Sequence, residues 1–143
     1  MLPESSRLIL DPIAFKQSLR PQVDKDTLKL YATGDRLINI WHARIRMNCS
    51  ILKANLYDLH VVDDPTCNCG SLREDSYHFF FECPNYATNR NELHQRIIYV
   101  GSFSFNLRTV LYGDPVLNLD ANIKIFRAVH NFIKDSGRFA TNN

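Results

Sequence analysis

Three cysteines and one histidine lie close together in this sequence, with the spacing of a metal site. They form the pattern C-x-C-x8-H-x4-C through Cys67, Cys69, His78 and Cys83. Three thiolates and one imidazole are a donor set of tetrahedral zinc sites, and four protein ligands leave no position for water. The sequence therefore predicts one Zn²⁺ ion with a structural role. Zinc binding contributes on the order of 10 kcal/mol to the folding of small zinc domains, so the ion would dominate the stability of this loop.

The spacing of the last two ligands places a demand on the chain. His78 and Cys83 are five residues apart, which is nearly one and a half turns of an α-helix, so an ideal helix does not align them. We therefore expect a helix end or a kink near Cys83, and Pro84 supplies such a break. On the other side of the site, Pro65 fixes a bend before the first thiol, and Gly70 lets the backbone curl tightly around the sulfurs.

Other interpretations of these residues stay open at this point. The thiols could be buried core filler, or Cys67 and Cys83 could form a disulfide. Alternatively, Cys49, His60 or His94 could replace one of the four ligands. For Cys49 itself, the favoured interpretation is a small structural thiol at a tight helix junction.

A helical hairpin from Asp35 to Leu59 precedes the metal pattern. Asp35 is placed to cap a first helix, and a second helix is expected to begin at Ser50 and to carry leucines at helical spacing. The apolar residues of the first helix recur at steps of three and four, so we expect one stripe to face the core: Leu37, Ile40, Trp41 and Ile45. The arginines of this helix lie beside or opposite that stripe, where solvent or a partner can reach them.

The rest of the chain also favours helices, and the predicted fold class is mainly α: a small helical domain with a basic helical hairpin and a structural zinc knuckle-like loop. Residues 1–34 are interpreted as a lead-in segment with one short helix over 12–19. Residues 35–100 hold the hairpin, the zinc loop and a helix from Pro84 to about Ile98, and 101–143 a connector and a C-terminal helix on the same core. Glu74 or Asp75 is expected to cap a short helix over 76–83, Leu93 and Ile97 are expected to face the core, and residues 107–112 should form an apolar turn.

The last helix is expected to begin at an Asp120 cap and to end at Gly137. Its inner face should carry five apolar residues: Ile123, Phe126, Val129, Phe132 and Ile133.

Length and composition fit one ordinary globular domain. The chain has 143 residues, of which 45% are hydrophobic and 22% are charged. Its net charge of +2 does not by itself indicate a nucleic-acid-binding protein. No apolar run approaches the ~20 residues of a membrane-spanning helix. The apolar residues 8–10 are interrupted by Asp11 and are too few for a secretory signal. We therefore expect an intracellular protein, in the nucleus or the cytoplasm, with no membrane partner.

Signatures of enzymes are missing from the sequence. It contains no Gly-rich phosphate loop, no G-x-S-x-G elbow and no H-E-x-x-H helix, so we expect neither catalysis nor a small-molecule substrate. Asp63 and Asp64 lie in a short loop before Pro65, which favours ordinary surface acids over a two-metal site.

Two other features of the sequence bear on the binding of nucleic acid. The run Phe79-Phe80-Phe81 could stack on bases, although core packing is favoured for at least two of the three rings. The basic residues around the hairpin could either bind phosphates or form a solvated surface: Arg36, Arg44, Arg46 and Lys53.

Several of these motifs occur together in one known family. The segment 34–50 (GDRLINIWHARIRMNCS), followed by 64–70 (DPTCNCG), 77–84 (YHFFFECP) and 111–114 (LYGD), resembles the C-terminal zinc-binding region of LINE-type (non-LTR) retrotransposon reverse transcriptases. That family has a basic helix reading roughly H-x-R-L-R, a Cys-Ser junction, C-x-C-G and an H-F-x-x-x-C-P tail, in this order. The resemblance covers about residues 34–114 and extends more loosely into the last helix.

The resemblance implies a tail that follows the polymerase part of a larger polyprotein. It implies Cys67, Cys69, His78 and Cys83 as zinc ligands, and a non-catalytic accessory role in binding RNA template or target DNA. It also implies His42, Arg44 and Arg46 as nucleic-acid contacts, which Arg36 and Lys53 would extend. No polymerase or endonuclease motif is present in these 143 residues. The alternative is a zinc-stabilised protein-interaction or structural module that does not bind nucleic acid, and the balanced charge favours it.

Overall fold

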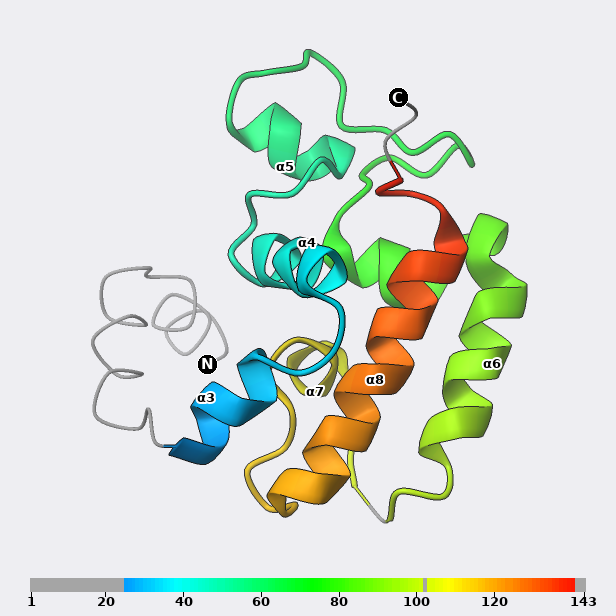
Figure 1. Ribbon diagram of the computed structural model, residues 1–143. Helices are drawn as coiled ribbons and strands as arrows, with labels where there is room; N and C mark the ends of the chain where they lie inside the picture. Colours follow the sequence, from blue (N-terminus) through cyan, green and yellow to red (C-terminus); the bar gives the residue numbers. More distant parts are fainter. Residues whose placement is uncertain (1–24, 102, 141–143) are drawn as a thin grey trace, which may run out of the picture.

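The computed structural model describes residues 25–101 and 103–140, and this part of the chain is mainly helical with no strand in it. The prediction of a mainly α fold is therefore confirmed. The helices, shown in Figure 1, are α3 (Lys25–Tyr31), α4 (Arg36–Arg46), α5 (Lys53–Asp58), the π-helical turn η2 (His78–Glu82), the 3-10 turn η3 (Pro84–Tyr86), α6 (Ala87–Ile97), α7 (Leu107–Tyr112) and α8 (Leu119–Ser136).

Helix α8 is the element on which the others pack. It contacts α3, α4, α6 and α7, and Figure 1 shows it crossing the middle of the molecule beside α6. Its inner face is apolar and largely inaccessible to solvent, with Ile125, Phe126, Val129 and Ile133 fully buried. Burying one such side chain stabilises the fold by roughly 1.5–3 kcal/mol, so this face supplies much of the hydrophobic core.

Of the two predicted ends of α8, one is confirmed and the other is wrong. Gly137 ends the helix in the left-handed conformation (φ 68°), which glycine adopts without strain, so this prediction is confirmed. The predicted cap, Asp120, is wrong. The helix begins at Leu119, and the extended residue Asn118 caps it by accepting a hydrogen bond from the Ala121 N–H (2.8 Å). Asp120 lies in the first turn, where its charge interacts favourably with the helix dipole.

Helix α4 begins as predicted, but its buried face is different. The Asp35 carboxylate accepts a hydrogen bond from the Leu37 N–H (2.9 Å) and caps the helix. The face turned to the core, however, carries Ile38, His42 and Ile45, whereas Leu37 and Ile40 are 52% and 37% exposed. Their predicted burial is therefore wrong. Sequence patterning places polar residues outside, and it does not anticipate a histidine whose hydrogen bonds are satisfied within the core.

The second half of the hairpin is shorter than predicted. Helix α5 begins at Lys53, not at Ser50, because the Ser50 hydroxyl is hydrogen-bonded to the Asn55 side chain (2.5 Å) and accepts from the Leu52 N–H (3.2 Å). Such local side-chain bonds hold the backbone out of the helix. Leu52 is nevertheless fully buried, as a core position should be.

One further difference concerns the N-terminal part. The predicted helix over 12–19 lies outside the described residues and stays a prediction. Within 25–34, where only a lead-in was expected, the chain forms α3, and this helix packs on α8. Elsewhere the predicted burial of Leu93 and Ile97 on α6 is confirmed, and so is the apolar turn over 107–112, which is α7.

No helix in the described ranges is both long enough and apolar enough to cross a membrane.

Candidate metal centre

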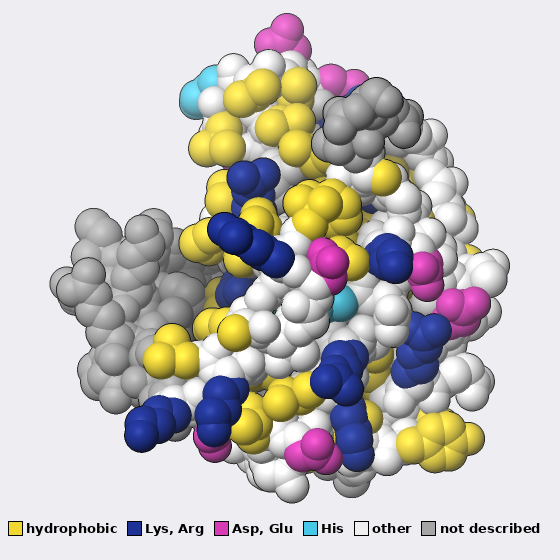
Figure 2. Space-filling model, viewed as in Figure 1, with side chains coloured by type: hydrophobic (Ala, Val, Ile, Leu, Met, Phe, Trp, Pro, Cys, Tyr) yellow, Lys and Arg dark blue, Asp and Glu magenta, His cyan; other side chains and the backbone are white. Residues whose placement is uncertain are grey.

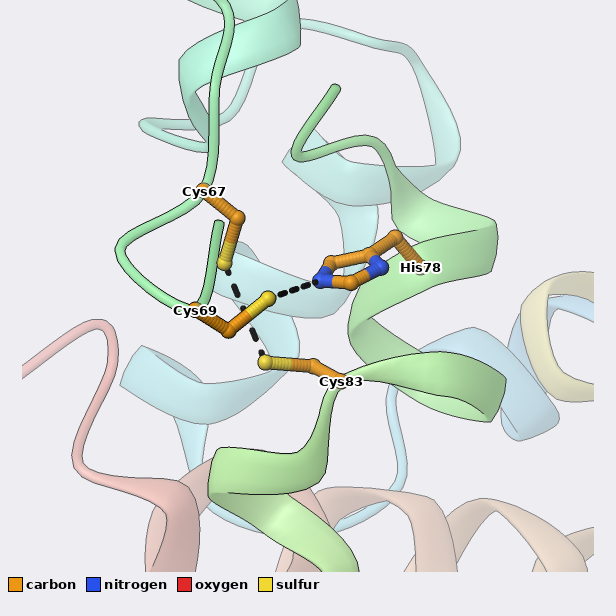
Figure 3. A group of neighbouring side chains, drawn as sticks. All are labelled: Cys67, Cys69, His78 and Cys83. Carbon is orange, nitrogen blue, oxygen red and sulfur yellow. Dashed lines mark hydrogen bonds between the residues drawn. The ribbon is translucent and has the colours of Figure 1, made fainter. Parts of the chain in front are cut away.

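Four side chains from two separate segments converge on one point. Cys67 and Cys69 come from the loop after α5, and His78 and Cys83 stand at the two ends of η2 (Figure 3). Their ligand atoms, three Sγ and one imidazole nitrogen, all lie within 4.8 Å of one another. The predicted set is therefore brought together as a group that could hold a metal ion.

One distance within this group matches the separation of two sulfurs in a tetrahedral zinc site. The Sγ atoms of Cys67 and Cys83 are 3.8 Å apart, and the Sγ of Cys69 is 3.3 Å from Nε2 of His78. In a tetrahedron built with metal–sulfur bonds of about 2.3 Å, two sulfurs are separated by about 3.8 Å. A disulfide would need about 2.05 Å between its sulfurs, so the alternative of a Cys67–Cys83 disulfide does not apply here, and both thiols are free.

The first two thiols are presented by a tight turn. The Gly70 N–H donates to the Cys67 carbonyl and the Cys67 N–H donates to the Ser71 carbonyl, each at 2.9 Å. Gly70 has φ +98°, in the region that side chains other than glycine rarely adopt. This turn folds Cys69 back toward Cys67, so that both sulfurs point to the same side, as Figure 3 shows.

A π-helical turn solves the spacing problem of the last two ligands. The Cys83 N–H donates to the His78 carbonyl at 2.8 Å, a bond that spans five residues instead of four. The wider turn brings residues five apart onto one face, which an α-helix does not do. The predicted break near Cys83 is therefore found, and its form is a π-helical turn followed by Pro84 at the start of η3.

The π-helical turn is held at both ends by side chains. At its start the Asp75 carboxylate accepts from the His78 N–H (2.8 Å), so of the two predicted caps Asp75 is the one observed. At its end the Arg90 guanidinium donates to the carbonyls of Phe80 (2.8 Å), Cys83 (3.0 Å) and Phe79 (3.3 Å). Arg90 thus satisfies carbonyls that a π-helix leaves free. Sequence reasoning missed it, because nothing in its spacing links it to the ligands.

The imidazole of His78 is oriented on both sides. Its Nε2 faces the sulfur of Cys69, and its Nδ1 lies 3.6 Å from Oε1 of Glu82. Histidines that bind metals commonly point their second nitrogen at a carboxylate, which fixes the ring and the tautomer. Glu82 is one turn from His78, so this contact follows from local geometry.

A buried ion pair connects the cysteine loop to two distant elements. The carboxylate of Glu74 accepts two hydrogen bonds from Arg138, at 2.8 and 2.9 Å, and one from the Lys53 N–H at 2.8 Å. Its Oε2 lies 4.0 Å from the Cys67 sulfur. Burial opposes the charged form of Glu74, but these hydrogen bonds outweigh it and lower its pKa. Glu74 thereby ties the loop that carries Cys67 and Cys69, which we call the metal loop, to the start of α5 and to Arg138, two residues after the end of α8.

The environments of the three thiols differ. Burial raises the pKa of Cys67, and it raises that of Cys83 to about 12. For Cys69, by contrast, the backbone N–H of Ser71 lowers the pKa. A cation at this point would reverse the penalty on the two buried thiolates, since a metal deprotonates the thiols that coordinate it.

The residues considered as substitutes lie outside this group. Cys49, His60 and His94 are exposed, and none of them belongs to the set of converging ligand atoms among the described residues. Phe79 and Phe80 are fully buried, with their rings against Phe132 of α8, which confirms core packing for two of the three phenylalanines.

The five residues predicted to contact nucleic acid are placed in three different ways. Arg36 and Arg44 are exposed on α4, and Lys53 is half-buried at the start of α5. His42, in contrast, is fully buried, and Arg46 is largely enclosed. In this fold the last two do not present themselves to an external ligand, because their polar atoms are used inside the molecule.

His42, Arg46 and His130 form a second polar group, which we call the histidine–arginine cluster. His42 Nε2 lies 2.8 Å from the Val110 carbonyl, which can only accept, so Nε2 carries the proton. Nδ1 of His42 therefore accepts, from His130 Nε2 (3.1 Å) and from the Arg46 guanidinium (3.3 Å). This assignment leaves Nδ1 of His130 buried and without a hydrogen-bond partner.

Arg46 is fixed on two sides in this cluster. Its Nε donates to the Leu111 carbonyl (2.6 Å), and its guanidinium lies 4.3 Å from the centroid of the Tyr31 ring. Burial, followed by the charge of Arg46, lowers the pKa of both histidines, that of His130 to about 4. The cluster thus joins α3, α4, α7 and α8 with neutral histidines.

Comparison with known proteins adds no relative to this description: no protein-family model, no curated protein and no solved structure matches the chain.

Proposed function

We propose that the chain is a zinc-stabilised helical module that binds RNA or DNA without catalysing a reaction. In this proposal it is an accessory tail like that of LINE-type reverse transcriptases, acting beside a polymerase part. One observation carries the proposal: the four residues of the C-x-C-x8-H-x4-C pattern converge to within 4.8 Å, directly after a hairpin that exposes arginines.

Zinc is the metal that this donor set favours. Three thiolates and an imidazole select Zn²⁺ over ions such as Mg²⁺ or Ca²⁺, which prefer oxygen ligands. Cys67, Cys69, His78 and Cys83 would hold it, and the carboxylate of Glu82 would orient the imidazole of His78. When bound, the ion cross-links the cysteine loop to η2. With four protein ligands it has no open position for a reacting water, which supports a structural role.

The nucleic-acid surface of this proposal is centred on α4. Arg36 and Arg44 are exposed there, and Lys53 lies at the start of the following helix. Arg36 and Arg44 form no ion pair with another described residue, so their charges are available for phosphates. The charge of Lys53 also acts on the nearby carboxylates of Asp64 and Glu74. His42 and Arg46 are left out of this surface because they are enclosed.

The metal part is tested by composition. Protein produced in zinc-supplemented medium should contain about one zinc per chain, measured by plasma mass spectrometry on the purified protein. The Cys69→Ser variant should lose the metal, whereas Cys49→Ser should keep it. Folded wild-type protein without metal would overturn this part of the proposal.

The binding part is tested by titrating labelled RNA and DNA over a series of salt concentrations. Affinity should fall steeply as salt rises, and an Arg36→Ala, Arg44→Ala double variant should have a slope smaller by about 1.4–1.8 units, since each contact contributes about 0.7–0.9. Arg73→Ala is the matched control, because Arg73 is already paired with Asp58. If the wild type shows no binding at low salt, nucleic-acid binding is rejected.

One observation favours the alternative of a protein-interaction module. Apolar side chains are exposed on and after α4, among the arginines: Leu37, Ile40, Met47 and Ile51 are 52%, 37%, 63% and 45% exposed. Such residues are typical of protein interfaces when they are contiguous. Binding of a protein partner that is lost in Leu37→Ser, Met47→Ser, together with no affinity for nucleic acid, would select this alternative.

A further inference from the structure

A basic groove runs between the C-terminal end of α6 and the middle of α8, away from the metal ligands. Its volume is about 300 Å³. The residues that line it combine cations, one aromatic ring and small or amide side chains: Arg96, Tyr99, Val100, Lys124, Arg127, Ala128 and Asn131.

One side of the groove is formed by a stripe of residues along α8. Lys124, Arg127, Ala128 and Asn131 are spaced as i, i+3, i+4 and i+7, so they form one stripe along the helix. Ala128 is 4% exposed, and its small side chain leaves space for the groove between α8 and α6. The cations Arg96, Lys124 and Arg127 line the groove around it.

The charge of this groove is largely uncompensated. Arg96 and Arg127 form no ion pair with another described residue. Lys124 is paired with Asp120 at 3.2 Å, but both side chains are well exposed, and such surface pairs are weak. In Figure 2, Lys and Arg side chains gather over the part of the surface where Figure 1 places α8.

An exposed aromatic ring completes the groove. Tyr99 lies in the turn after α6 and is 86% exposed. Many of the described aromatic rings pack against one another in the core, and Tyr99 is the most exposed of the described aromatic side chains. A ring held beside cations can stack on a nucleic-acid base, while the cations bind the adjoining phosphates.

We propose that this groove binds a single-stranded segment of nucleic acid, with phosphates at Arg96, Lys124 and Arg127 and a base stacked on Tyr99. The inference rests on the proposed function and adds to it a second surface, built by α6 and α8, whereas the first is built by α4 and α5. The volume lies at the small end of ligand-sized pockets. It accommodates one splayed nucleotide, and a duplex, whose bases are stacked internally, cannot offer a base to Tyr99.

The test compares binding of a fluorescein-labelled twelve-nucleotide oligouridylate to the full chain and to groove variants. Tyr99→Ala should weaken binding about tenfold, and Tyr99→Phe should restore most of it, since stacking needs only the ring. Arg127→Ala should lower the slope of log affinity against log salt by about 0.7, the value for one phosphate on a single strand. Lys134→Ala is the matched control on the same helix, because Lys134 does not line the groove. All four changes are at the surface, and circular dichroism confirms folding.

The outcomes separate this inference from the function on which it rests. If Tyr99→Ala and Arg127→Ala bind like the wild type while the α4 double variant is weakened, the groove is rejected and the proposed function stands. If the wild-type chain binds a twelve-base-pair duplex as tightly as the single strand, with both binding modes insensitive to Tyr99→Ala, the groove is likewise rejected. If the wild type binds neither, both proposals fail together.

Discussion

Two of the buried polar groups in the described part of the chain are built in opposite ways. The four residues that could hold a metal ion, which we call the metal cluster, lie within 17 consecutive residues, from Cys67 to Cys83, and their positions are set by a tight turn and a π-helical turn. The histidine–arginine cluster joins residues 88 positions apart, since His42 contacts His130, and no local motif connects them. The first group is made by its own segment, and the second exists only when α4 and α8 have packed.

The difference between them concerns charge as well as distance. The metal cluster gathers three thiols that favour a cation, whereas the histidine–arginine cluster already contains a cation, Arg46, surrounded by rings and carbonyls. The first group would gain stability from a ligand that the chain does not supply. The second satisfies all but one of its buried polar side-chain atoms by itself. Removing one member should therefore have different consequences in the two groups.

The largest effect is expected at the metal cluster. Cys83→Ser should abolish zinc binding and unfold the segment around residues 65–84, since the ion contributes on the order of 10 kcal/mol. Thermal unfolding followed by circular dichroism, with metal content measured in parallel, checks this. Cys49→Ser is the control and should stay within about 0.5 kcal/mol of wild type, because Cys49 is exposed. Equal stability of the two variants would contradict a structural metal.

The next effect tests whether the metal loop depends on the distant core. Arg138→Ala removes the partner of Glu74 and leaves a buried carboxylate unpaired, which should cost about 3 kcal/mol in the free energy of unfolding and weaken zinc binding about tenfold. Urea unfolding and competition with a zinc chelator measure the two quantities.

The matched control for this change replaces both partners. A Glu74→Gln, Arg138→Met double variant should lose less stability than the sum of its single changes, because neither charge is then left alone. If Arg138→Ala changes neither stability nor zinc affinity, the metal loop is independent of the end of α8.

The two neighbouring arginines of α4 offer a sharper comparison. Arg46→Ala should destabilise the fold by about 2 kcal/mol, because the Leu111 carbonyl loses its donor and the Tyr31 ring loses the cation above it. Arg44→Ala should change stability by less than about 0.5 kcal/mol, yet weaken the proposed binding of nucleic acid. Urea unfolding of both variants, followed by binding titrations, distinguishes them. Exchanged phenotypes would refute the division of α4 into an inner and an outer arginine.

The smallest effect is the response of the histidine–arginine cluster to pH. The pKa values of His42 and His130 are lowered in the folded state, that of His130 to about 4 from an ordinary value of 6.5. The unfolded chain therefore binds protons that the folded chain does not, and stability falls as the pH drops below about 6.5 and continues to fall toward pH 4. Between pH 7 and pH 6 each histidine should cost about 0.7 kcal/mol.

Urea unfolding across this range measures the loss, and an optical zinc indicator shows where metal release begins, so that only points with bound metal are compared. Nitrogen chemical shifts of the His130 ring provide a direct check, since the ring should still be neutral at pH 5. A protonated ring at that pH in the folded protein would contradict the description of this cluster.

The sequence determined those features that depend on a few neighbouring residues. The C-x-C-x8-H-x4-C spacing identified all four converging ligands, and the mismatch between five residues and an α-helical turn required a break before Pro84. The cap at Asp35 and the end at Gly137 also follow from local chemistry: a carboxylate accepts from free N–H groups, and glycine adopts positive φ. Each of these involves a short stretch whose geometry its own residues dictate.

Only the tertiary structure decided which face of α4 is buried and what the distant polar groups do. Apolar patterning favours Leu37 and Ile40 as core residues, but the packing of α4 on α7 and α8 buries His42 instead, since the Val110 carbonyl and His130 satisfy it there. In the same way, Arg138 reaches Glu74 across 64 positions. A buried polar side chain is tolerated only where a partner meets it, and where that partner comes from a remote helix, the sequence alone contains no local sign of the pair.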